Sequence, residues 1–156
     1  MTFFELLNSN GQLLAAIGAV FATMFAGIGS AIGVGKAGQA GAAVISENPD
    51  LFGSVLVLQL LPGTQGIYGL LIGFVIAQKA GLLGATDLVV SGAAGMQLLF
   101  ASLPIAFGGL LSASGIMMVG KRPEEAGKGI IFAVMVETYA VLALLFSFLM
   151  VNGVQL

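Results

Sequence analysis

The 156-residue sequence contains no cysteine, no histidine and no tryptophan, and charged residues make up 8% of it. The absence of cysteine and histidine excludes disulfide bonds, imidazole acid–base chemistry and most transition-metal sites. Five basic residues and a net charge of −2 argue against a nucleic-acid partner. The sequence offers no nucleophile–base pair, so we do not expect the chain to be an enzyme on its own.

What the sequence has in abundance is apolar surface and glycine. Hydrophobic residues account for 58% of the chain, and 24 residues are glycine. The mean hydropathy is +1.09, a value typical of an integral membrane protein. Small residues let helix backbones approach closely in lipid, where hydrophobicity does not drive helix association. The composition therefore predicts a closely packed helical membrane protein.

Long apolar runs separated by proline-containing polar loops predict four transmembrane helices. We expect them in two tandem helical hairpins, 1–80 and 81–156. The predicted helices span about residues 11–46, 51–79, 88–119 and 124–151. Pro49 in the first hairpin corresponds to Pro123 in the second, and Tyr68 to Tyr139. This correspondence indicates an internal duplication in an all-α fold.

Glu137 is the acidic residue on which a functional interpretation depends. It lies near the middle of the apolar run GIIFAVMVETYAVLALLFSFLMV, residues 129–151. An ionised carboxylate at that depth costs roughly 2.5–3.5 kcal/mol on insertion scales, so intramembrane acids are functional candidates. The alternative is a structural role, a protonated glutamic acid hydrogen-bonded to a neighbouring helix. When the two hairpins are aligned on their tyrosines, Glu137 falls opposite Gly66, so the first hairpin has lost the carboxylate.

A proline in the second predicted helix places polar groups at membrane depth. Pro62 lacks an amide hydrogen and should kink the helix, and Thr64 and Gln65 follow directly. A freed carbonyl, a hydroxyl and an amide oxygen within one turn suit a hard cation. Alternatively, Thr64 and Gln65 only hydrogen-bond a neighbouring helix. Pro104 should likewise kink the third helix.

A stripe of small residues runs along the first predicted helix, through Gly29, Gly33, Ala37 and Gly41. A phosphate-binding loop is the alternative interpretation of this glycine-rich stretch. It is disfavoured because the flanking strand and the GxxxxGK[ST] order are missing. Close helix packing is the better prediction.

Basic residues predict how the chain lies in the membrane. Lys121, Arg122 and Lys128 cluster at the second hairpin turn. By the positive-inside rule, the loops 46–52 and 120–128 are cytoplasmic and both termini lie outside the cell membrane. Lys79, on the outer side, is an exception to this pattern.

Several motifs together resemble the proteolipid ring subunit (c or K) of V-type rotary ATPases in its duplicated four-helix form. The segments that carry the resemblance are GIGSAIGVG, LQLLPGTQGIYG, LPIAF and KRPEEAGKGIIFAVMVETYA. They cover nearly the whole chain and are most similar to sodium-translocating bacterial members. The resemblance implies a non-catalytic subunit that carries Na⁺ or H⁺, with no other cofactor.

The resemblance also implies roles for individual residues and partners. Glu137 would be the ion-binding carboxylate. Leu61 would give a carbonyl ligand, Thr64 a hydroxyl ligand and Gln65 an amide ligand to Na⁺, and Tyr68 would lock the carboxylate. Identical subunits would form a ring in membrane lipid, against an a/I-type stator subunit, with a central stalk docked on the loops 46–52 and 120–128. ATP hydrolysis in other subunits would drive rotation.

One departure from the sodium-type pattern concerns the third helix. Those members carry a further glutamine there, and the corresponding position in this chain is Gly108 or Ile116, depending on the direction of counting. Neither offers an amide oxygen; water, Ser112 or a backbone carbonyl would have to replace it. A proton-carrying ring therefore remains an alternative. More remote alternatives are a small proton-coupled transporter and a pore-forming or purely structural proteolipid.

Overall fold

The computed structural model describes residues 2, 5, 9–84, 88–110 and 116–156. These residues form helices and connecting turns, and no strand occurs among them. The elements, in chain order, are α2 (Gly11–Glu47), η1 (Pro49–Leu51), α3 (Phe52–Leu60), η2 (Leu61–Gly63), α4 (Thr64–Lys79), α5 (Gly92–Gly108), α6 (Ile116–Lys121), η3 (Pro123–Glu125) and α7 (Ala126–Gly153).

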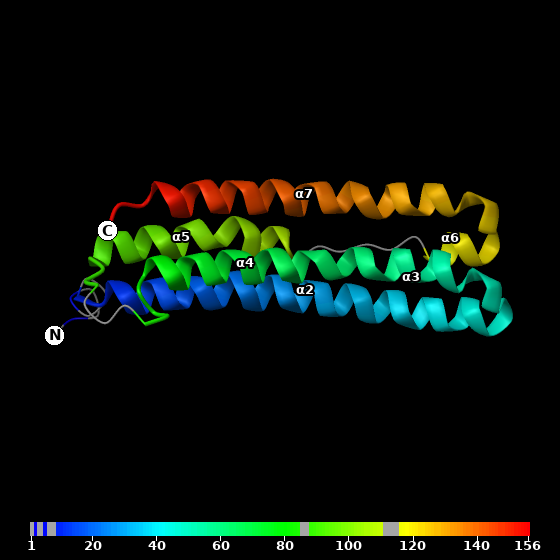
Figure 1. Cartoon of the computed structure of the whole chain (residues 1–156), viewed down its shortest axis with the longest axis horizontal. Helices are drawn as coiled ribbons and strands as arrows, with labels where there is room; N and C mark the ends of the chain where they lie inside the picture. The colour runs from blue at the N-terminus through cyan, green and yellow to red at the C-terminus, as the bar shows by residue number, and fades with distance from the viewer. Residues whose placement is uncertain (1, 3–4, 6–8, 85–87, 111–115) are drawn as a thin grey trace.

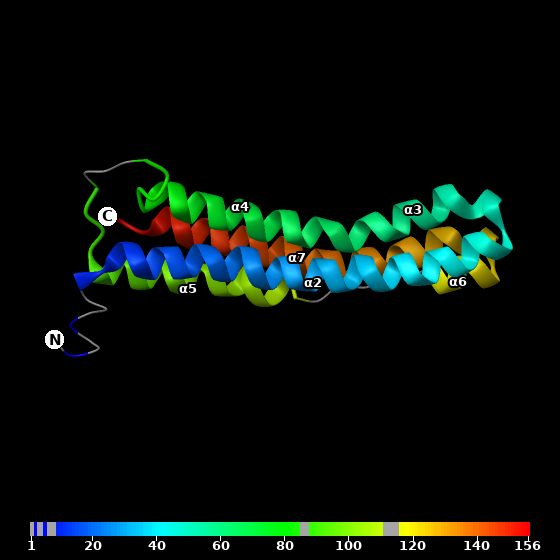
Figure 2. The ribbon, with the colours of Figure 1, turned by 90° about the horizontal axis from the view of Figure 1, so that it is seen from below.

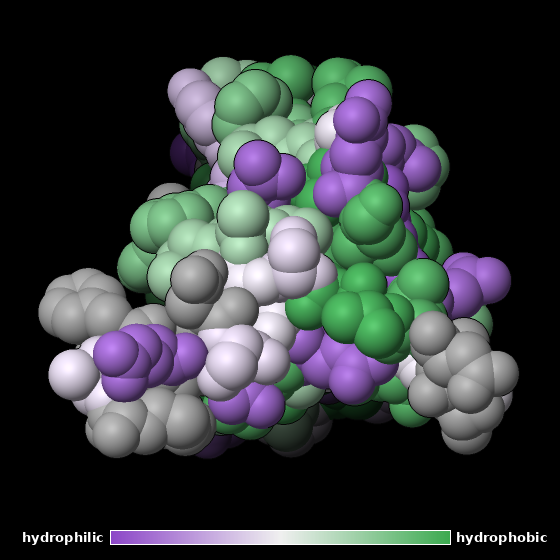
Figure 3. Space-filling model, turned by 90° about the vertical axis from the view of Figure 1, so that its left-hand side faces the viewer, coloured by the Kyte–Doolittle hydropathy of each residue, from purple (hydrophilic) through white to green (hydrophobic). Residues whose placement is uncertain are grey.

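The helices lie side by side in an elongated bundle (Figures 1 and 2). Both termini lie at one end, and the two proline-containing hairpin turns lie at the other. α2 packs mainly against α4 and α5, while α7 packs against α5 and α4. Figure 3 shows that polar and apolar residues intermingle on the end that carries the termini. The arrangement is that of the predicted tandem hairpins.

The first, second and fourth predicted helices are present with small shifts of their ends. α2 extends to Glu47, and the second helix is continuous from Phe52 to Lys79 as α3, η2 and α4. Its middle is a 3₁₀ turn, Leu61–Gly63, at the predicted proline. The 3₁₀ turn η3 (Pro123–Glu125) precedes α7, which is helical from Ala126 to Gly153.

The third predicted helix, 88–119, differs from the structure. Residues 88–90 precede α5 outside any helix, and α5 ends at Gly108. α6 begins at Ile116, and residues 111–115 of the predicted helix lie outside the described residues. Two adjacent glycines of low helix propensity, Gly108 and Gly109, lie at the end of α5.

The small-residue stripe of α2 is buried against the other helices, as predicted. Gly29, Gly33, Ala37 and Gly41 all belong to its buried face. Across the interface, Gly69 of α4 lies so close to the backbone of α2 that a methyl group there would clash. Small side chains thus set the spacing between α2 and α4.

Helix length and hydropathy support a membrane protein. Among the described residues, three segments are long and apolar enough to cross a membrane: Gly11–Glu47, Pro49–Lys79 and Pro123–Gly153. α5 is also apolar but has 17 residues. It continues through Pro104, and the amide of Ile105 donates to the buried Ser147 hydroxyl of α7 at 3.1 Å.

Candidate functional site

Thr64 connects the kinked helix to the intramembrane acid. It is the first residue of α4, directly after the 3₁₀ turn at Pro62. Its hydroxyl lies 2.8 Å from the Leu61 carbonyl oxygen and 2.7 Å from Glu137 Oε1. Three of the predicted ion ligands, Leu61, Thr64 and Glu137, therefore meet at one point between α4 and α7.

The 3₁₀ turn places the Leu61 carbonyl beside the backbone and side chain of Thr64. Pro62 supplies no amide hydrogen, so the regular helical bonding pattern breaks at this turn. The Thr64 amide instead reaches back to the Leu61 carbonyl. On the other side, the Ser30 hydroxyl of α2 donates to the Gly63 carbonyl at 3.1 Å. The turn is thus stabilised by the Thr64 amide of its own helix and by the Ser30 hydroxyl of α2.

The two short contacts of Thr64 cannot both be hydrogen bonds donated by its hydroxyl. A hydroxyl has one hydrogen to donate. When Thr64 donates to Glu137 Oε1, the Leu61 carbonyl still accepts the Thr64 amide. When Thr64 donates to the Leu61 carbonyl, its oxygen and Glu137 Oε1 face each other at 2.7 Å, and a proton or a cation between them would remove their repulsion. The contact therefore fits a hydrogen bond to the carboxyl as well as a shared proton or cation.

Gln65, the residue after Thr64 in α4, carries a buried acceptor that lacks a partner among the described residues. Its side chain is 2% exposed, and its Oε1 has no hydrogen-bond partner among the described residues. Leaving a buried acceptor unpaired costs about 1–3 kcal/mol. A cation coordinated by this oxygen would remove that cost, so the unpaired atom fits the role of an oxygen ligand.

Tyr68 completes the group of predicted residues. One turn after Thr64 on α4, it is partly buried, and its side chain interacts with the carboxyl of Glu137 and with the hydroxyl of Thr64. A tyrosine hydroxyl can donate to a carboxylate and hold its orientation. Leu61, Thr64, Tyr68 and Glu137 are thus linked by contacts, and Gln65 follows Thr64 in α4.

Neither candidate for the absent third-helix amide reaches the site with a ligand. Gly108 lies at the end of α5 against Ala143 of α7. Ile116 is buried in α6, in the same apolar cluster as Ala37 and Ala133. Ser112, the other replacement considered, lies outside the described residues.

Glu137 is the one carboxylate in the described contacts of the site. At Gly66, the residue opposite Glu137 in the duplicated hairpin, an added Cβ atom would lie 3.0 Å from the Ser30 side chain, a tight contact. Among the described residues, no group of three His, Cys, Asp or Glu side chains gathers as a metal cluster. A monovalent ion or a proton suits one negative charge better than a divalent metal does.

Ser30 is the residue that sequence reasoning missed at this site. Its signal was present: it is the one hydroxyl in the stretch AGIGSAIGVG, otherwise made of glycine, alanine and branched aliphatic residues. Its side chain is 8% exposed and faces the kink of the neighbouring helix. The partner carbonyl, Gly63, could not be identified without the packing of α2 on α4.

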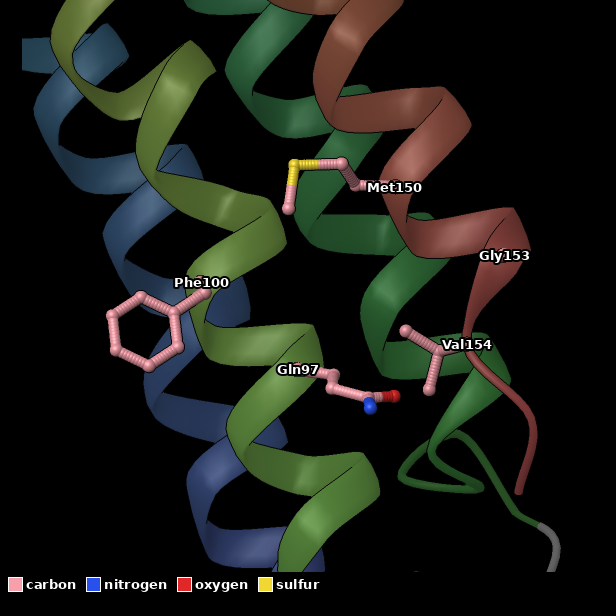
Figure 4. A pocket seen from close by; sticks show the side chains of 5 residues that line it. All are labelled: Gln97, Phe100, Met150, Gly153 and Val154. Carbon is pink, nitrogen blue, oxygen red and sulfur yellow. The ribbon is translucent and has the colours of Figure 1, made fainter.

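A hollow between α5 and α7, far from Glu137, has different chemistry (Figure 4). It has a volume of about 340 Å³ and is lined by Gln97, Phe100, Met150, Gly153 and Val154. Gln97 brings the one polar side chain of this lining. Without a carboxylate, this hollow offers no counter-charge for a cation.

Comparison with known proteins places the chain among rotary ATPase ring proteins. Residues 17–76 and 90–150 each match the model of the ATP synthase C subunit family. V-type sodium ATPase subunit K of Enterococcus hirae is 48% identical over 159 residues, covering 97% of this chain and 98% of that protein.

Two further relatives extend the comparison. A-type ATP synthase subunit K of Methanocaldococcus jannaschii is 36% identical, over 91% of this chain and 63% of its own length. The ATP synthase c subunit of Syntrophomonas wolfei is 41% identical, over 42% of this chain and 96% of its own length. The double match to one family model confirms the predicted duplication.

Proposed function

Because the chain belongs to the ATP synthase C subunit family, we propose that Glu137 carries one cation per subunit across the membrane as a ring of these subunits rotates. The subunit itself is non-catalytic, and ATP hydrolysis in other subunits of the complex drives the rotation. The observation that carries this proposal is the contact of Thr64 with both Leu61 and Glu137, to which the buried, unpaired oxygen of Gln65 adds support.

Na⁺ is the proposed cargo. Carbonyl, hydroxyl, amide and carboxylate oxygens are the ligands that hard cations prefer. Leu61, Thr64, Gln65 and Glu137 offer one of each, and one carboxylate neutralises one monovalent charge. The relative from E. hirae is named as a sodium ATPase subunit, which supports the same cargo here.

Neutralisation explains how Glu137 can face lipid during rotation. A bare carboxylate in the hydrocarbon region costs several kcal/mol. With a cation bound, or with a proton, the residue becomes neutral and the ring can turn. At the stator the ion exchanges with water, and Tyr68 holds the loaded carboxylate in place between exchanges.

The remaining partners and the orientation belong to the same proposal. Copies of this chain surround a common axis in membrane lipid, with α2 and the α5–α6 layer inside and the α3–α4 segment and α7 outside. An a/I-type subunit forms the stator, and a central stalk docks on the loops 46–52 and 120–128 at the cytoplasmic side.

One carboxylate per four helices affects the energetics of pumping. It roughly halves the ions carried per turn relative to a ring of equal size with an acid in each hairpin. Moving one charge against 100 mV costs about 2.3 kcal/mol, so each ion receives a larger share of the ATP energy. This ratio favours pumping against a steep gradient over ATP synthesis.

A proton-carrying ring is the second candidate, and one observation favours it. The 2.7 Å contact between Thr64 and Glu137 is also the geometry of a protonated carboxyl donating to a hydroxyl oxygen. Gly108 and Ile116 provide no amide in place of the glutamine of sodium-type rings. In this case Thr64 and Gln65 would be hydrogen-bond partners of the acid.

Carbodiimide labelling distinguishes the two candidates. A hydrophobic carbodiimide attacks protonated buried carboxyls, and mass spectrometry of the purified ring would locate the adduct across pH with and without Na⁺. We expect modification at Glu137, slowed by millimolar Na⁺ but not by K⁺. Glu137→Gln is the matched control: it should assemble into rings, resist labelling and transport no ion.

The possible results distinguish the sodium ring from the proton ring and test whether Glu137 is the carrier. Labelling at Glu137 that depends on pH alone would favour the proton ring. Absence of any adduct at Glu137, or ion transport retained in the Glu137→Gln variant, would contradict the assignment of Glu137 as the carrier.

A further inference from the structure

Lys79 makes an unusual contact between two helices. It ends α4, and its ammonium donates to the carbonyl oxygens of Val151 at 2.8 Å and Asn152 at 3.1 Å, in the last turn of α7. The last carbonyls of a helix have no partner within it and carry the negative end of the helix dipole. Lys79 therefore caps the C-terminal end of α7 from another helix.

This contact and the Thr64–Glu137 contact have the same axial spacing. α4 and α7 run in the same direction (Figure 1). From Thr64 to Lys79, α4 rises about 22 Å, and from Glu137 to Val151, α7 rises about 21 Å. α4 and α7 are therefore in contact at two levels, the ion site and the end of the bundle that carries the termini. The two levels are separated by nearly the same length along each helix.

α7 needs such a contact because it has little apolar packing within the subunit. Of its most apolar 18-residue window, 17% is buried, compared with 44% for α2. In lipid, apolar contacts do not hold helices together as they do in water, so polar contacts carry more of the association. At the same end of the bundle, Gln12 of α2 donates to the carbonyl of Leu88, which precedes α5, at 2.8 Å.

We propose that Lys79 is a positioning residue for ion binding: by capping α7 it fixes the axial register that holds Glu137 against Thr64. This inference rests on the proposed function, because it concerns the same ion site. It also explains the lysine that departs from the positive-inside pattern, since its charge is used by helix-end carbonyls.

The primary test measures the Na⁺ concentration that half-protects Glu137 from carbodiimide in intact rings. Lys79→Met should raise it roughly fivefold to tenfold, within the usual range of coupling between distant sites. Lys79→Arg, which keeps the charge and the donors, should restore the parent value. Gln78→Met, at the neighbouring exposed position, is the matched control and should change nothing.

A second measurement reports the register independently of the ion. Because the chain has no cysteine, spin labels can be attached at cysteines introduced for the exposed Leu71 of α4 and Leu142 of α7. With labelled subunits diluted in unlabelled ones, the distance distribution should shift or broaden in Lys79→Met and not in Gln78→Met. If the parent ring shows no Na⁺ protection of Glu137, the sodium proposal fails. The distance between the labels still tests whether Lys79 fixes the register of α7 beside α4.

Unchanged half-protection together with an unchanged distance in Lys79→Met would overturn the proposal. Where Lys79→Met fails to assemble, Lys79→Ala, which also removes the donor, takes its place in both measurements. Loss of the ring in both variants would also overturn it, since Lys79 would then be needed for assembly rather than for positioning.

Discussion

At the scale of single residues, the site is defined by acceptors that lack donors. Thr64 has one hydrogen for two close oxygens, and the buried Gln65 Oε1 has no partner among the described residues. Stability and ion binding therefore oppose each other here. In the proposed function, the oxygens that would bind a cation are a cost to the subunit when the cation is absent.

Gln65→Leu should separate these two effects. Leucine has a similar size and removes the unpaired amide, so the ion-free ring should become more resistant to heat, by about 1–3 kcal/mol per subunit. The same change should weaken Na⁺ protection of Glu137 by about tenfold or more. Thermal unfolding without Na⁺ and carbodiimide labelling with Na⁺ would measure the two effects. A ring that loses heat resistance and keeps its Na⁺ protection would contradict this account.

At the scale of elements, the site depends on how closely α4 approaches α2. The 3₁₀ turn at Leu61–Gly63 is anchored by Ser30 of α2, and Gly69 lies one and a half turns beyond Thr64 against the α2 backbone. A displacement of α4 from α2 would move the kink and Thr64 together. The small residues of α2 are thus part of the site's geometry as well as of the packing.

Gly69→Ala should disturb this approach. A methyl group at Gly69 would meet the Ala22 carbonyl and the Ala26 side chain, which cannot move without displacing α2. Overpacking of this kind typically costs about 1–3 kcal/mol. Gly53→Ala, where α3 has open space, is the control. We expect lower ring yield and weaker Na⁺ protection in Gly69→Ala alone; equal behaviour of both variants would refute the argument.

At the scale of the whole molecule, the termini and the two proline-containing turns lie at opposite ends of the bundle. Both termini and the connection after α4 lie at one end, and the turns around Pro49 and Pro123 lie at the other (Figure 1). The turn around Pro123 is flanked by Lys121, Arg122 and Lys128. Lys128 pairs with Glu125 there at 2.6 Å. The arrangement requires both turns to face the same side of the membrane.

Single cysteines would determine which side that is. Glu124→Cys lies in the exposed turn and Leu156→Cys at the C-terminus, and the parent chain has no cysteine to interfere. We expect a membrane-impermeant maleimide to label Glu124→Cys in inverted vesicles and Leu156→Cys in right-side-out vesicles. The opposite pattern would reverse the proposed orientation and leave the fold unchanged.

The sequence by itself determined the features that depend on local chemistry. Apolar length predicted the membrane helices, Pro62 predicted the break in the second helix, and the depth of Glu137 singled it out as the acid to explain. The duplication was also visible in the sequence, in the paired prolines and tyrosines. These features involve a few neighbouring residues or a single helix, so they can be recognised without knowledge of the packing.

Only the tertiary structure decided which residues meet across helices. The bond of Ser30 to Gly63 and the capping of α7 by Lys79 both depend on the axial position of one helix beside another. No periodicity within a single helix encodes that position, because a shift by one turn returns the same face to the neighbour. Close small-residue contacts and a few buried polar bonds select one register, and that register places Thr64 beside Glu137.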